Sequence, residues 1–102
     1  MKQVLAGLVF IAAVAAAQAA DVQIKDYKFV PEKLTVKAGT TVKWVNDEKR
    51  ASHSVWFKDE GLPESERLFR GETWSRKFDK PGAYPYTCGP HPEMHGVVEV
   101  TP

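Results

Sequence analysis

The sequence predicts an all-β fold, namely an antiparallel Greek-key β-sandwich or barrel of about seven to eight short strands. Apolar and polar residues alternate over short runs, which is typical of strands that bury one face. Turn-forming residues separate these runs, as at Ala38-Gly39 and at Pro81-Gly82. Helical periodicity is almost absent, so a helical or mixed fold is not expected.

The first strand signal begins at residue 22. Residues 22–24 alternate between apolar and polar, and the alternation resumes at Tyr27 and Phe29. The pattern shifts by one residue at Lys25-Asp26. A shift of this kind indicates a β-bulge, because one extra residue moves every following side chain to the other face.

The strongest strand signal is the segment from Thr40 to Asn46. Val42 and Trp44 lie on one face of it, and β-branched and aromatic residues dominate it. A weaker alternating run at 34–36 precedes it, after a break at Pro31-Glu32.

The C-terminal half continues as short strands and loops, and Pro85 indicates that its strand lies at a sheet edge. The expected elements are a polar loop at 46–52, a short β-prone run at 54–57, an irregular excursion with one helical turn at 58–70, a strand at 73–78, a turn at 79–82, a strand at 84–88, a tight loop at 89–95 and a last strand at 97–101.

Residues 1–19 have the pattern of a secretory signal peptide. Lys2 precedes an apolar run at 4–17, and Ala17-Gln18-Ala19 supplies small residues for cleavage. The alternative is a membrane anchor, but the run is short for a transmembrane helix, which needs roughly 20 apolar residues. We therefore expect a domain of residues 20–102 that is exported to the periplasm without stable membrane insertion.

The charge balance argues against nucleic acid as a partner. The chain has 14 basic and 13 acidic residues. Removal of the leader takes away Lys2 alone, which leaves 13 of each sign. Nucleic-acid binding requires a basic field, and a balanced surface does not provide one.

Cys88 is the single cysteine, so a disulfide within the chain is excluded. An unpaired cysteine in an exported chain indicates a reactive thiol, a bridge between chains or a metal ligand. A domain this small often needs additional stabilisation, for example from a metal.

The segment from Cys88 to Met94 reads Cys-Gly-Pro-His-Pro-Glu-Met, and it lies in a predicted loop between two strands. With the distant His53, it offers two imidazoles, a thiolate and a thioether, which is the ligand set of a blue-copper electron-transfer site. Zinc is the main rival, because Cys and His also bind it. Methionine is a poor zinc ligand and a good copper ligand, so Met94 favours copper.

At these residues the chain resembles the cupredoxins, most closely the amicyanins, with plastocyanins and pseudoazurins as relatives. The resemblance covers nearly the whole domain: residues 40–46, the segment beginning at His53, residues 71–75 and residues 78–88. The short Cys-x-x-His-x-x-Met loop is the amicyanin version. The family commonly has Asn after the first histidine, where its side chain ties the ligand loops together, and this chain has Ser54.

The resemblance implies one copper ion per chain, bound by His53, Cys88, His91 and Met94. It implies a one-electron carrier rather than an enzyme, with Asn46 and Ser54 beside the ligands. Electrons are expected to leave through His91, within a surface patch that includes Pro90 and Pro92. Partners are then transient redox proteins, as small interfaces are typical of such encounters, and the chain is expected to be a monomer.

Two other functions remain open at this point. The same soft ligands would serve a copper carrier or storage protein. Cys88 could also bridge two chains in a structural dimer without metal. His95 follows the methionine directly, and we expect it to be solvent-exposed beside the site rather than a ligand.

Overall fold

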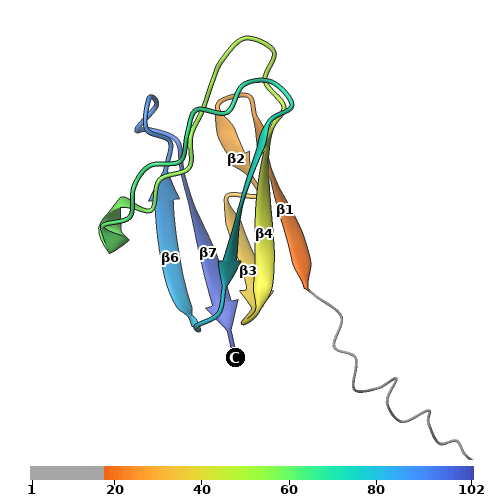
Figure 1. Cartoon of the computed structure of the whole chain (residues 1–102), viewed down its shortest axis with the longest axis vertical. Coiled ribbons are helices and arrows are strands. Elements are labelled where there is room, and N and C mark those ends of the chain that lie inside the picture. Colours follow the sequence, from red (N-terminus) through yellow and green to blue (C-terminus); the bar gives the residue numbers. More distant parts are fainter. Residues whose placement is uncertain (1–17) are drawn as a thin grey trace, which may run out of the picture.

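The computed structural model describes residues 18–102, and in these residues it has seven β-strands and one short 3-10 helix, η2 (Figure 1). The predicted leader, residues 1–19, lies outside the described residues except for Gln18 and Ala19. The elements are β1 (Ala19–Lys25), β2 (Lys28–Val30), β3 (Lys33–Lys37), β4 (Thr40–Asn46), η2 (Lys58–Glu60), β5 (Thr73–Phe78), β6 (Gly82–Thr87) and β7 (His95–Thr101).

The strands form a four-stranded sheet of order β2-β1-β4-β5 and a three-stranded sheet of order β3-β7-β6. The predicted all-β architecture is therefore confirmed. Two pairings differ from the predicted antiparallel arrangement, because β1 runs parallel to β4 and β3 runs parallel to β7. The chain crosses from one sheet to the other at β2–β3, β3–β4 and β5–β6, so strands that are neighbours in a sheet need not be consecutive in sequence.

The core lies between the two sheets and is centred on β4. Val42 and Trp44 are fully buried, as their alternation with Lys43 predicted. The indole of Trp44 contacts four aromatic rings at centroid distances of 5.3 to 6.4 Å, namely those of Phe57, Trp74, Phe78 and Tyr86. Large aromatic side chains thus fill the centre of the core in this small domain.

The predicted bulge at Lys25-Asp26 is wrong, because the chain makes a two-residue hairpin turn there. Lys25 pairs with Lys28, and Asp26 and Tyr27 have φ angles of 53° and 56°. Two left-handed residues in succession match the twist of the flanking strands. The Tyr27 N–H, which points out of the turn, donates to Glu48 Oε1 at 2.7 Å, so a distant acid supports this turn.

The β-prone run at 54–57 is not a strand of either sheet. Two isolated bridges hold it instead, one between His53 and Leu68 and the other between Trp56 and Thr87. Trp56 and Thr87 exchange backbone hydrogen bonds of 2.9 and 3.0 Å. The run thus attaches to the end of β6, immediately before Cys88.

The loops that carry the chemistry gather at one end of the sandwich. In Figure 1 the β1–β2 turn, the connection after β4 and the loop between β6 and β7 all lie at the upper end, opposite the C-terminus. Ring contacts of Tyr27 with His53 and with His91 join these three segments directly.

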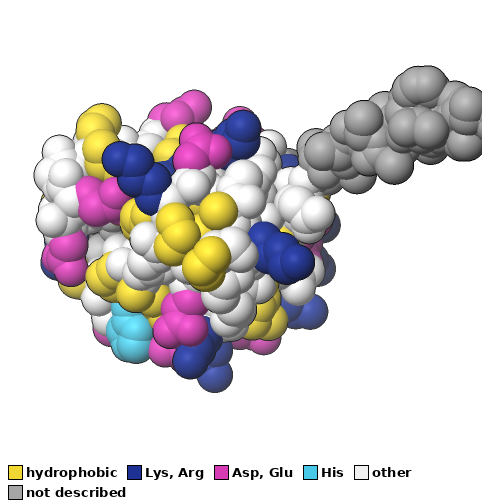
Figure 2. All heavy atoms as spheres, turned by 90° about the horizontal axis from the view of Figure 1, so that it is seen from below, with side chains coloured by type: hydrophobic (Ala, Val, Ile, Leu, Met, Phe, Trp, Pro, Cys, Tyr) yellow, Lys and Arg dark blue, Asp and Glu magenta, His cyan; other side chains and the backbone are white. Residues whose placement is uncertain are grey.

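The surface carries interspersed charges on the face seen from below in Figure 2, where basic and acidic side chains alternate with apolar ones. This distribution gives no single-signed field on that face. Within residues 18–102, no helix has the length and apolar character needed to cross a lipid bilayer.

Arg76 closes the edge where β5 of one sheet meets β6 of the other. Its guanidinium carbon lies 4.5 Å from the ring centres of Phe57 and Phe78 and 5.2 Å from that of Tyr84. Its two terminal nitrogens donate to the two carboxylate oxygens of Glu60 at 2.8 and 2.9 Å. A planar cation can stack and bind bidentately at once, which an ammonium cannot do.

We expect Arg76→Lys to lower the free energy of unfolding by about 1–2 kcal/mol, because lysine loses the bidentate pair and most of the stacking. Guanidinium unfolding followed by tryptophan fluorescence measures this change. Lys77→Ala is the matched control, since Lys77 is an exposed cation on the next residue of β5. Equal unfolding midpoints for the two variants would contradict the role given to Arg76.

Candidate metal centre

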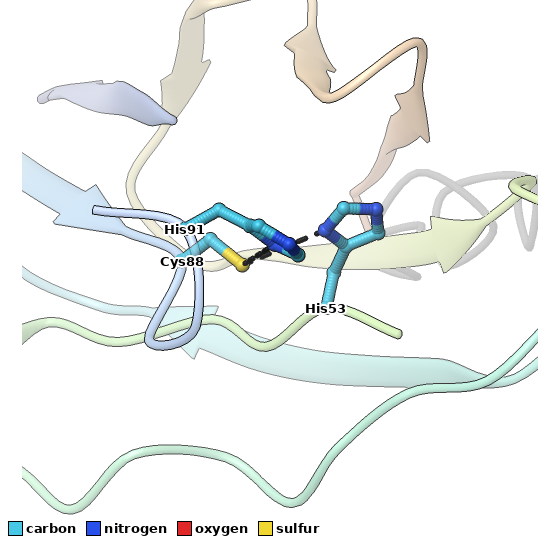
Figure 3. A group of neighbouring side chains, drawn as sticks. All are labelled: His53, Cys88 and His91. Carbon is cyan, nitrogen blue, oxygen red and sulfur yellow. Dashed lines mark hydrogen bonds between the residues drawn. The ribbon is translucent and has the colours of Figure 1, made fainter. Parts of the chain in front are cut away.

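Cys88 directly follows β6, and its side chain lies at the centre of a small cluster of donor atoms. Its sulfur is 3.6 Å from Nδ1 of His53 and 3.6 Å from Nδ1 of His91. Figure 3 shows both imidazoles turned toward this sulfur from different segments of the chain. The three potential ligand atoms all lie within 4.8 Å of one another, and Cys88 and His53 are fully buried.

Both the backbone and the imidazole ring of His53 have hydrogen-bond partners. Its backbone exchanges hydrogen bonds of 3.1 and 2.7 Å with Leu68. Its Nε2 lies 3.3 Å from Glu48 Oε1, so the carboxylate accepts a hydrogen bond from the Nε2–H tautomer, in which Nδ1 keeps a lone pair on the side of Cys88. Burial lowers the pKa of His53 against the opposing effect of Glu48, and the neutral form is the one that binds metals.

The loop from Cys88 to Met94 is closed by its own backbone. The Met94 N–H donates to the His91 carbonyl at 2.9 Å, and the Cys88 N–H donates to the Met94 carbonyl at 3.1 Å. Met94 is buried, whereas His91 is partly exposed. Pro90 is partly exposed and Pro92 is exposed, so the outer side of this loop faces solvent.

The cluster fits a single metal ion. Nitrogen and sulfur ligands lie about 2.0–2.3 Å from such an ion, which separates neighbouring ligands by about 3.5 Å. The sulfur-to-nitrogen distances of 3.6 Å in the structure agree with this value. Burial raises the pKa of the Cys88 thiol, although the Ser54 N–H at 3.4 Å opposes the shift, so a bound cation would displace a proton.

Asn46 organises the chain between β4 and His53. Its Nδ2 donates to the carbonyls of Ala51 at 3.1 Å and Leu68 at 2.7 Å, and its Oδ1 accepts from the Glu48 N–H at 2.9 Å. The side chain is fully buried, and three hydrogen bonds satisfy it. Asn46 thereby fixes both Leu68, which pairs with His53, and Glu48, which orients the imidazole.

Ser54 lies between the two ligand segments. Its hydroxyl accepts from the Gly89 N–H at 2.8 Å and donates to Glu64 Oε2 at 2.6 Å. Ser54 therefore contacts the predicted ligand Cys88 directly, whereas Asn46 is linked to His53 only through Leu68 and Glu48.

The sequence did not point to three residues at this site. Glu48 and Glu64 are ordinary loop acids by sequence, and only the tertiary structure brings them to His53 and Ser54. Tyr27 lies with its ring edge-on to His53 and His91, at centroid distances of 5.3 and 5.0 Å, and is half exposed. The alternating pattern placed Tyr27 in a strand, so its position beside the histidines left no sign in the sequence.

His95 is not part of the cluster of His53, Cys88 and His91. It is exposed, as expected, and its Nδ1 lies 3.2 Å from a carboxylate oxygen of Glu32.

Comparisons with known proteins agree with this geometry. The family model described as a cupredoxin-like domain matches residues 3–100. The chain is 40% identical over 90 residues to amicyanin-alpha of Methylorubrum extorquens, covering 84% of this chain and 75% of that protein. It is 41% identical to amicyanin of Paracoccus versutus, covering 82% and 66%, and 38% identical to plastocyanin of Scenedesmus fuscus, covering 62% and 74%.

Solved structures give the same result. The crystal structure of the Paracoccus versutus amicyanin aligns with a TM-score of 0.73 at 37% identity and covers 87% of each chain. A copper-containing nitrite reductase of Thermus scotoductus aligns with a TM-score of 0.76 at 30% identity, but the match covers only 22% of that longer chain against 82% of this one.

We expect Asn46→Ala to lower the free energy of unfolding by about 2–4 kcal/mol, because three backbone groups, of which the Leu68 carbonyl is buried, lose their hydrogen bonds to this side chain. Urea unfolding of the metal-free protein measures the loss without any contribution from bound metal. Lys49→Ala, an exposed substitution in the same loop, is the control. A destabilisation no larger than that of the control would contradict the organising role of Asn46.

Proposed function

The chain belongs to the cupredoxin family, and from this premise we propose that it is a blue copper protein that carries one electron at a time between redox partners. One copper ion per chain is bound by His53, Cys88, His91 and Met94 in this proposal. The observation that carries it is the buried Cys88 sulfur, 3.6 Å from Nδ1 of each histidine.

Copper supplies a one-electron Cu(II)/Cu(I) couple when it is bound at this centre. The chain's own contribution is to hold the donors. Backbone pairing with Leu68 positions His53, and the closed loop from Cys88 to Met94 positions the other ligands. Donors that are held this firmly move little when the charge of the site changes, which is what rapid electron transfer requires.

Met94 supports copper over zinc. A soft thioether suits copper, whereas structural and catalytic zinc sites use Cys, His and carboxylate ligands. Met94 is buried at the end of the ligand loop and is tied by its backbone to both Cys88 and His91.

Electron exchange is proposed to occur at His91, because it is the partly exposed member of the donor cluster. Pro90 and Pro92 flank it, and the half-exposed ring of Tyr27 lies against it. A small surface of this kind suits a brief encounter between a monomeric carrier and a redox protein.

The role proposed is electron transfer and not catalysis. The four proposed ligands occupy the positions that a mononuclear copper ion of this type offers, which leaves none for a substrate. The structural similarity to a nitrite reductase concerns 22% of that chain and supports a shared fold.

The proposed site of action is the periplasm, with residues 1–19 removed as a leader. We expect the protein isolated from a periplasmic fraction to begin at Ala20, because small residues at Ala17 and Ala19 suit signal peptidase. N-terminal sequencing measures this directly. An Ala19→Leu variant should be processed poorly, and an uncleaved Met1 in the membrane fraction of the unaltered protein would contradict export with cleavage.

Visible absorption after addition of Cu(II) tests the proposed function. We expect an intense blue thiolate-to-copper band in the unaltered protein and its loss in Cys88→Ala, because that variant lacks the sulfur ligand. Glu93→Ala changes an exposed residue of the same loop and should keep the band. A colourless protein with bound metal would contradict electron transfer and favour a copper carrier or a zinc site, and a reducible dimer without metal would favour a structural role.

A further inference from the structure

Ser54 lies where three segments meet, and it touches each of them. Its N–H lies 3.4 Å from the Cys88 sulfur, and its hydroxyl accepts from the Gly89 N–H at 2.8 Å. The same hydroxyl donates to Glu64 Oε2 at 2.6 Å. Ser54 is fully buried, so water does not replace these partners.

The single proton of the hydroxyl makes Glu64 important to this arrangement. A serine oxygen donates one hydrogen bond and accepts with its lone pairs. With its proton directed to the carboxylate, the oxygen presents lone pairs to the Gly89 N–H. An asparagine side chain, which the family commonly has here, can donate and accept with two different atoms. Serine has one oxygen for both roles, so a second residue must accept the hydrogen bond that its hydroxyl donates.

The position of Glu64 is itself fixed. Its neighbour Ser65 is bound to Val55 twice, through the Val55 N–H to Ser65 Oγ at 2.9 Å and through the Ser65 N–H to the Val55 carbonyl at 3.0 Å. The carboxylate packs so closely on Gly89 that a Cβ atom at position 89 would overlap Glu64 Oε2. Arg67 Nε lies 3.6 Å from that oxygen on the solvent side, where the Glu64 side chain is 30% exposed.

We propose that Glu64 is a positioning residue of the copper centre: its carboxylate orients the Ser54 hydroxyl, which holds Gly89 and hence Cys88 against the segment that carries His53. Its negative charge also lies against Gly89, the residue after Cys88, where it favours Cu(II) over Cu(I) and lowers the reduction potential. This second effect rests on the proposed function, whereas the tie to Gly89 does not depend on bound metal.

Amide hydrogen exchange of the Gly89 N–H tests whether Glu64 holds Gly89 through the Ser54 hydroxyl. In the metal-free full chain we expect Glu64→Ala to speed this exchange by about tenfold relative to the unaltered protein, because the hydroxyl no longer has a fixed direction. Ser54→Ala should do the same, and the double variant should exceed neither, since both residues act through one hydrogen bond. Glu66→Ala removes an exposed acid of the same segment and should leave Gly89 unchanged. Equal exchange rates of Gly89 in Glu64→Ala and Glu66→Ala would overturn the positioning role of Glu64.

The reduction potential tests the charge effect in the copper-loaded protein. Glu64→Gln keeps an oxygen that accepts from Ser54 but removes the charge, so we expect the potential to rise while the position of the blue band stays the same. Glu66→Gln removes an equal charge from an exposed, solvent-screened side chain and should raise the potential less. A potential in Glu64→Gln no higher than that in Glu66→Gln would overturn this part of the proposal.

The two measurements separate this proposal from the proposed function. If the chain failed to form a blue copper centre, the exchange rate of the Gly89 amide in the metal-free chain would still show whether Glu64 orients the Ser54 hydroxyl. If the centre formed and Gly89 exchanged equally in all variants, the electron carrier would stand and the role of Glu64 would fall.

Discussion

The whole site depends on the constraint that brings the Cys88 sulfur and His53 together across 35 residues of sequence. Sheet geometry fixes one partner, because Cys88 directly follows β6. Isolated bridges fix the other, since Trp56 pairs with Thr87 and His53 pairs with Leu68. The donors are thus positioned by backbone hydrogen bonds that do not involve the metal. This explains how residues 18–102, whose one helix is the three-residue η2, can hold a rigid centre.

The packed interior of the sandwich fixes the strands from which the ligand loops start. Trp44 occupies the middle of the sandwich with aromatic rings around it, and Arg76 stacks on three rings where the two sheets meet. Side chains in such a core interdigitate closely, so the strands cannot slide against one another. The ligand loops at the end of the sandwich therefore start from fixed points.

The sequence predicted those parts of the molecule that local patterns encode. The alternation of Val42 and Trp44 identified β4 with its observed bounds, and the ligand loop was recognisable because Cys88, His91 and Met94 lie within seven consecutive residues. Tertiary contacts were not recognisable in this way. The turn at Asp26 and Tyr27 lacks the Asn-Gly signal of such turns, and the carboxylate that supports it comes from Glu48, 21 residues away. The parallel pairings of β1 with β4 and of β3 with β7 likewise depend on crossings between sheets that alternation does not report.

X-ray absorption at the copper edge, recorded on the same protein in its oxidised and reduced forms, tests the central claim most directly. The account predicts one short sulfur and two nitrogen neighbours in both forms, with little change in distance between them, because the fold and not the oxidation state sets the ligand positions. A spectrum dominated by oxygen neighbours, or a large rearrangement on reduction, would contradict a centre whose ligands are positioned in advance by the protein.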